Sequence, residues 1–120
     1  MRVLIIEAKT KTVSSIAASL ERQEVVVLGY SERTDWEVVA QEWRPDVIVV
    51  DITMTGMKGL DTIYRMRKTL PEATILATGL GNSKSCRVSP LEVGAHEYIV
   101  NSELHTKLLP AIRRALESRG

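Results

Sequence analysis

The chain has 120 residues, a length that fits one domain with a single hydrophobic core, so we expect residues 1–120 to form one domain. Its 16 basic and 15 acidic residues give a formal net charge of +1, which disfavours direct binding to nucleic acid or to an anionic membrane. The single cysteine, Cys86, excludes an internal disulfide. With no apolar stretch of membrane-spanning length and no signal peptide at the start, we expect a soluble, cytoplasmic protein.

Five short apolar runs predict buried strands, and segments with helical spacing separate them. The strand candidates are 3–6, 25–28, 47–50, 74–77 and 98–100. The helix candidates, which carry apolar residues three or four positions apart, are 13–20, 36–43, 60–70 and 104–115. This alternation predicts a doubly wound α/β protein with a five-stranded parallel sheet and helices on both faces. Trp36 and Trp43 fall on the buried stripe of their helix and are interpreted as core residues.

The segment between the fourth and fifth strand candidates breaks this rhythm. It is rich in glycine and small polar residues, and Pro90 would clash inside a helix spanning 83–93. Ser89 is instead interpreted as the N-cap of a helix that starts at Pro90, with Glu92 completing a capping box. We therefore expect a long mobile loop over 79–88 and a very short fourth helix.

Two acidic residues stand at the ends of predicted buried strands, where a carboxylate loses hydration unless it is paired or used. Asp51 ends the run 47–50 and precedes a turn-forming stretch with two glycines, and Glu7 ends the run 3–6. For either acid alone, a strand end that faces water is an equal alternative. Together they favour a cation or phosphoryl site at the carboxyl edge of the sheet.

In these features the chain resembles the receiver domains of two-component response regulators, over nearly its whole length. The resemblance is carried by the strand and loop 47–59 with Asp51, by Thr78 at the end of the fourth strand, and by Tyr98 in the fifth. It implies the flavodoxin-like strand order 2-1-3-4-5 and a phosphoryl group on Asp51. It also implies that the Thr78 hydroxyl contacts that group and that Tyr98 changes rotamer on activation.

The site departs from the family pattern at two charged positions. Ala8 stands where receivers place the second of two acids, which binds Mg²⁺ directly, and Asn101 replaces the lysine that follows the fifth strand. The resemblance leaves Glu7, Asp51 and a main-chain carbonyl near Thr53 as metal ligands, so we expect weak binding of Mg²⁺. Loss of the lysine removes a charge that would stabilise a phosphoaspartate.

Three functions stay open. The first is a phosphorelay receiver that takes its phosphoryl group from a histidine kinase or phosphotransfer protein and acts on a downstream protein or effector domain. The second is a pseudo-receiver that works by protein binding without phosphorylation, and the third is a small ligand-binding or enzymatic module on the same fold. The third is disfavoured because the chain lacks a glycine-rich phosphate loop, and because His96, His105 and Cys86 have no partner at catalytic or zinc-ligand spacing. We expect an atypical, non-enzymatic receiver, as a monomer or a homodimer.

Overall fold

The computed structural model describes residues 2–7, 18, 24–29, 36–53 and 58–119. Five parallel strands form one sheet in the order β2-β1-β3-β4-β5. The strands are β1 (Arg2–Glu7), β2 (Glu24–Gly29), β3 (Val47–Asp51), β4 (Thr74–Gly79) and β5 (Glu97–Val100). The helices are α2 (Trp36–Trp43), α3 (Lys58–Thr69), α4 (Lys84–Glu92) and α5 (Leu104–Arg119), the last preceded by the 3₁₀ turn η1 (Asn101–Glu103).

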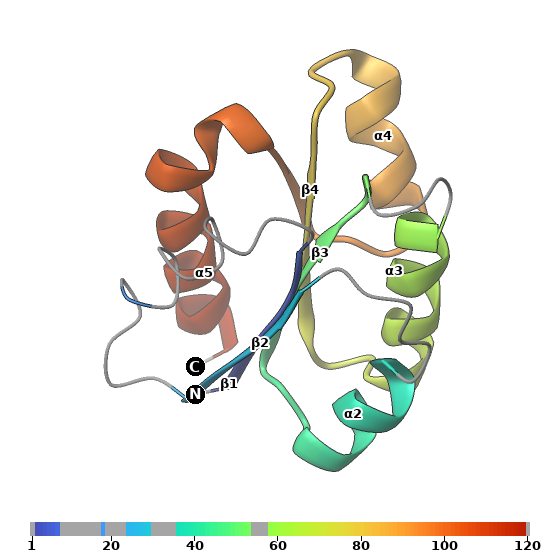
Figure 1. Ribbon diagram of the computed structural model, residues 1–120, viewed down its shortest axis with the longest axis vertical. Helices are drawn as coiled ribbons and strands as arrows, with labels where there is room; N and C mark the ends of the chain where they lie inside the picture. The colour runs from blue at the N-terminus through green and yellow to red at the C-terminus, as the bar shows by residue number, and fades with distance from the viewer. Residues whose placement is uncertain (1, 8–17, 19–23, 30–35, 54–57, 120) are drawn as a thin grey trace.

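The helices lie on both faces of this sheet, with α5 on one side and α2, α3 and α4 on the other (Figure 1). The predicted α/β class with a parallel sheet and helices is confirmed. Apart from Ala18, which is helical, the predicted helix over 13–20 lies outside the described residues. No helix in the described part of the chain is both long and apolar enough to cross a membrane.

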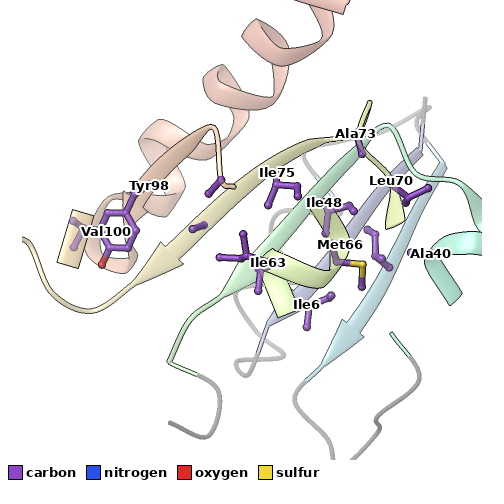
Figure 2. Packing of buried hydrophobic residues seen from close by; sticks show 14 residues of the cluster. Ile6, Ala40, Ile48, Ile63, Met66, Leu70, Ala73, Ile75, Tyr98 and Val100 are labelled. Carbon is purple, nitrogen blue, oxygen red and sulfur yellow. The ribbon is translucent and has the colours of Figure 1, made fainter. Parts of the chain in front are cut away.

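Alternation along the strands divides the core between the two faces of the sheet. On the α5 face, strand residues such as Val49 and Leu76 pack against Leu108 and Ile112 of the helix. On the opposite face, Ile63 and Met66 of α3 cover their neighbours in the same strands (Figure 2). Every residue of β3 and β4 is buried, as expected for the central strands of a sheet covered on both faces.

Trp36 and Trp43 begin and end α2 and pack, partly buried, against the core on the α3 side of the sheet. Their interpretation as core residues is confirmed. Trp43 also lies under the Arg2 guanidinium, 5.6 Å from the ring centroid to Cζ, so the end of α2 is joined to the start of β1.

The structure of α4 corrects the prediction for the segment after β4. Ser83, rather than Ser89, is the N-cap, and its Oγ accepts a hydrogen bond from the Cys86 main-chain N–H at 3.4 Å. Pro90 lies inside this nine-residue helix, in its last turn, where the missing N–H removes one hydrogen bond near an end that would fray. Pro90 is also the buried residue of α4, so packing offsets that loss. The predicted long loop is wrong, since only residues 80–83 connect β4 to α4.

His96 joins the amino ends of β4 and β5. Its main-chain N–H donates to the Ile75 carbonyl at 2.7 Å, and its Nδ1 accepts from the Ile75 N–H at 3.1 Å. The imidazole therefore takes the place of a main-chain carbonyl, which requires an unprotonated Nδ1. Burial, and then the nearby Arg67 guanidinium, lower the pKa of His96, while the hydrogen bond with the Ile75 main chain and the Glu97 carboxylate act in the opposite direction. His96 lies on the surface, but its ring completes the hydrogen bonding of the sheet.

The lowered pKa of His96 makes the stability of the fold depend on pH. Because the folded pKa lies below the unfolded value of about 6.5, the unfolded state binds the proton more readily. The stabilising contribution is present above pH ~6.5 and is lost as the pH falls through the folded pKa. Urea unfolding at about pH 7.5 and about pH 5.5 should show the loss.

The variant His96→Asn provides the matched control for this prediction. An asparagine oxygen at this position accepts from the Ile75 N–H without titrating, so its loss of stability over the same pH range should be smaller. Equal losses in the two proteins would show that His96 does not contribute.

Candidate functional site

The carboxyl edge of the sheet brings together residues that lie far apart in the sequence. Ile6 of β1 pairs with Val50 of β3 in parallel register. Glu7 and Asp51, the residues that follow them, therefore end two adjacent strands at one edge. Asp51 pairs in turn with Thr78 of β4. The described main chain thus places the two predicted acids and the predicted hydroxyl side by side, while the side chain of Glu7 lies outside the described part of the structure.

Asp51 is a buried carboxylate with a fixed orientation. It is 1% exposed, and its Oδ1 accepts hydrogen bonds from the Thr53 N–H at 2.9 Å and from the Thr53 Oγ1 at 2.6 Å. This Asx-turn holds the carboxylate at the start of the connection from β3 to α3. Loss of water around the group makes its interaction with a cation or an electrophilic phosphorus stronger than it would be in solution.

The same connection is tied to the neighbouring strand and to α3. The Ile52 N–H donates to the Thr78 carbonyl at 2.9 Å, which extends the β3–β4 ladder beyond the strands. Gly59 in the first turn of α3 lies directly against the Ile52 main chain, and a Cβ at position 59 would overlap it. Glycine at this position therefore allows α3 to begin close to Asp51.

Two buried polar atoms at this end of the sheet have no hydrogen-bond partner within the described residues. They are Thr78 Oγ1, on a side chain that is fully buried, and Asn101 Oδ1, in the turn that follows β5. An unpaired buried polar atom costs about 1–3 kcal/mol, so its persistence calls for an explanation such as a ligand that completes it. Thr78 pairs in register with Asp51, and such a ligand would lie beside the carboxylate.

Tyr98 lies in the core on the α3 side of the sheet, near Val100 (Figure 2). Its side chain is buried, and its hydroxyl donates to the Gly81 carbonyl at 2.7 Å. Burial raises the pKa of Tyr98, as expected for a phenol that loses water around its ionised form. The hydroxyl therefore joins β5 to the connection between β4 and α4.

The donor atoms at the edge suit a hard cation. Asp51 and Thr53 present oxygen atoms, the ligands that Mg²⁺ prefers, and Mg²⁺ often takes only one or two carboxylates and keeps several waters. In the described part of the chain, no three His, Cys, Asp or Glu side chains come together as a metal group. Ala8, which the sequence predicts to stand at one of the two departures from the family pattern, lies outside the described residues, as does the side chain of His105.

The contact between Thr53 and Asp51 was not predicted from the sequence. An aspartate at the start of a turn commonly accepts a hydrogen bond from the main-chain N–H two residues on, so Asp51 itself could have revealed it. The hydrogen bond from the Ile52 N–H to the Thr78 carbonyl leaves no such signal in the sequence, because it depends on the register of two strands.

Comparison with known proteins identifies the class to which this fold and site belong. Residues 3–113 match the response regulator receiver domain family. The chain belongs to this family, whose members act in two-component signal transduction, and the buried Asp51 fits the position of the phosphoacceptor.

Individual relatives agree with this assignment. The chain is 31% identical over 118 residues to the transcriptional regulatory protein AfsQ1 of Streptomyces coelicolor, covering 98% of this chain and 52% of the relative. It is 30% identical over 119 residues to the transcriptional regulatory protein LiaR of Bacillus subtilis, covering 96% and 56%. The chain thus spans about half the length of these relatives.

Solved structures show the same fold. The receiver domain of RstA from Klebsiella pneumoniae, in a BeF3-activated form, superposes with a TM-score of 0.82 at 25% identity, covering 97% of this chain and 98% of that one. The signal receiver domain of a DNA-binding response regulator from Colwellia psychrerythraea gives a TM-score of 0.82 at 21% identity, covering 98% of both chains.

The unpaired hydroxyl of Thr78 predicts an unusual response to mutation. Thr78→Val replaces a buried hydroxyl that has no hydrogen-bond partner among the described residues by a methyl group, so the free energy of unfolding should rise by about 1 kcal/mol. Thr106→Val is the matched control, because the Thr106 hydroxyl donates to the Glu103 carbonyl at 3.2 Å on the surface, and no gain is expected there. Urea unfolding of the free protein measures both. A loss of stability in Thr78→Val would mean that the hydroxyl is satisfied in the free protein.

Proposed function

We propose that residues 1–120 form a single phosphorelay receiver domain in which Asp51 accepts a phosphoryl group from a histidine kinase or phosphotransfer protein. The observation that carries this proposal is a carboxylate only 1% exposed at the end of β3, in register with Thr78, whose hydroxyl has no hydrogen-bond partner in the described part of the chain. The flavodoxin-like strand order supports it, since β3 is the middle strand and its carboxyl end lies at the centre of the edge.

The transfer step follows from these groups. Asp51 Oδ1 already accepts two hydrogen bonds from Thr53, so we assign the other oxygen, Oδ2, as the nucleophile. This oxygen attacks the phosphorus of a phosphohistidine, the O–P bond forms as the P–N bond breaks, and the electron pair stays on the imidazole nitrogen, which then takes a proton. The Thr78 hydroxyl donates a hydrogen bond to a phosphoryl oxygen.

A Mg²⁺ ion and the Asn101 amide would assist this transfer by contacting the phosphoryl oxygens. When bound by Glu7, Asp51 and the main-chain carbonyl of Thr53, Mg²⁺ supplies positive charge for the phosphoryl oxygens. Asn101 can donate through its amide but carries no charge. A neutral hydrogen bond contributes about 0.5–1.5 kcal/mol and a charged one about 1.5–3 kcal/mol, so the modified state gains less stabilisation than with a lysine. The population shift on phosphorylation should therefore be small.

A second candidate is a pseudo-receiver that binds its partner without phosphorylation. The specific observation in its favour is the loss of two charged groups from one small site, at Ala8 and Asn101. On either account the partner is a downstream protein or an effector domain, because the matched relatives are transcriptional regulatory proteins about twice as long as this chain.

Labelling with a small phosphodonor separates the two candidates. With acetyl phosphate and Mg²⁺, intact-mass measurement should show slow addition of one phosphoryl group. Asp51→Asn should abolish this addition, and Asn101→Lys should accelerate it about tenfold, the equivalent of ~1.4 kcal/mol. Asp61→Asn is the matched control, because Asp61 lies exposed on α3 in an ion pair with Arg65.

Labelling that survives in Asp51→Asn would overturn the assignment of the acceptor. The absence of labelling in the unmodified protein and in Asn101→Lys would favour the pseudo-receiver.

Mg²⁺ affinity tests the contribution of the missing second acid. Because Ala8 supplies no carboxylate, calorimetry should show weak binding in the unmodified protein and about tenfold tighter binding in Ala8→Asp. Ala8→Asn is the matched control, since it has nearly the same size without the charge. Equal affinities of the Ala8→Asp variant and the unmodified protein would show that residue 8 does not reach the ion.

A further inference from the structure

The end of β4 and the connection from β4 to α4 lie close to the side chains of Tyr98 and Cys86. A Cβ built on Gly79 would lie 2.5 Å from the Tyr98 hydroxyl oxygen and 3.0 Å from Tyr98 Cε1. A Cβ on Gly81 would overlap the Cys86 sulfur. Distances below 3.0 Å are not tolerated by real Cβ atoms, so both glycines are needed for clearance in this arrangement.

Both the Gly79 main chain and the Tyr98 side chain are held in place by their neighbours. Gly79 is the last residue of β4 and pairs with Val100 of β5. Thr78, the residue before it, pairs with Asp51 and accepts a hydrogen bond from the Ile52 N–H. The Tyr98 ring is buried in the core, with the hydroxyl held on the Gly81 carbonyl at 2.7 Å. A Cβ at position 79 would also approach Ile52 Cγ1 to 3.0 Å, but its closest contact, at 2.5 Å, would be with the Tyr98 hydroxyl oxygen. A side chain there would therefore act first on that hydroxyl.

We propose that residue 79 determines the position of Tyr98. Glycine at this position allows the Tyr98 hydroxyl to donate its hydrogen bond to the Gly81 carbonyl in the unphosphorylated chain, and we call this hydrogen bond the latch. The latch fixes the Leu80–Ser83 connection and thereby the start of α4 without any change at Asp51. This inference deepens the proposed receiver function, on which its regulatory meaning rests. It assigns to Gly79 a role as positioning residue for the tyrosine.

The latch lies next to an exposed apolar surface around α4 that a partner could contact. Leu80, in the latched connection, and Leu91, on α4, are exposed apolar side chains, at 68% and 44% exposure. Their positions depend on the connection that Tyr98 holds. The surface around α4 is therefore preset in the free chain, and phosphorylation has less left to change there.

Nuclear magnetic resonance of the free protein with ¹³C-labelled tyrosine rings tests the latch. Tyr98→Phe assigns the Tyr98 signal, and the exposed Tyr64 serves as the internal reference. In the unmodified protein the Tyr98 phenol should titrate above the ordinary tyrosine value of about 10. In Gly79→Ala it should titrate near the ordinary value of about 10 and its ring shifts should approach those of Tyr64.

A double-mutant cycle separates the latch from a general packing defect. Gly79→Ala should lower the midpoint of urea unfolding, and this loss should fall by at least half in the Tyr98→Phe background, where the hydroxyl is absent. If Gly79→Ala does not fold, the double variant should fold. Tyr64→Phe is the matched control for removal of a hydroxyl and should leave the effect of Gly79→Ala unchanged.

Three results would overturn the latch: Tyr98 titrating at the ordinary value of about 10 in the unmodified protein, an unchanged Tyr98 signal in Gly79→Ala, or equal losses in the two backgrounds. All measurements use protein without phosphodonor. Failure of the latch therefore leaves the Asp51 assignment untouched, and failure of Asp51 to accept a phosphoryl group leaves the latch measurable.

Discussion

The parallel register of the sheet is the constraint on which the rest of this molecule depends. Parallel strands all end at the same edge, so residues that are distant in sequence become neighbours there without any further device. In this chain the register sets Asp51 beside Thr78, and the tie from Ile52 continues it past the strand ends. Complete burial of β3 and β4 then removes water from the carboxylate and from the hydroxyl. A desolvated carboxylate in register with a buried hydroxyl follows from the sheet itself.

Within the described residues, the hydrogen-bond donors that hold the Asp51 carboxylate are neutral. They are the main-chain N–H and the side-chain hydroxyl of Thr53. Neutral donors can orient an oxyanion, but they contribute less than charged donors when charge builds up on a phosphoryl group. Under the proposed function, the neutral amide of Asn101 would therefore leave a small difference in stability between the free and the modified states.

Glycine serves a different purpose near this site than its usual role in loops. Gly59, Gly79 and Gly81 each lie against a neighbour so closely that a Cβ would not fit. Gly59 brings α3 against the Ile52 main chain, Gly79 brings the end of β4 against the Tyr98 ring, and Gly81 brings the β4–α4 connection against Cys86 of α4. The segment after β4 is thus closely packed, and the same residues that resemble loop breakers in the sequence are positions of close contact in the fold.

The sequence alone determined the α/β class, the apolar strands and the core role of Trp36 and Trp43, because period-two and period-3.6 patterns record burial directly. It also located Asp51, since an acid at the end of a buried strand is conspicuous without any structure. It failed for α4, where Pro90 was taken as a helix start, because the cost of a proline depends on its place in the helix and on its burial, and neither is local. The contacts of Ile52 with Thr78 and of Tyr98 with Gly81 were decided only by tertiary structure, because each depends on how strands distant in sequence align at one edge.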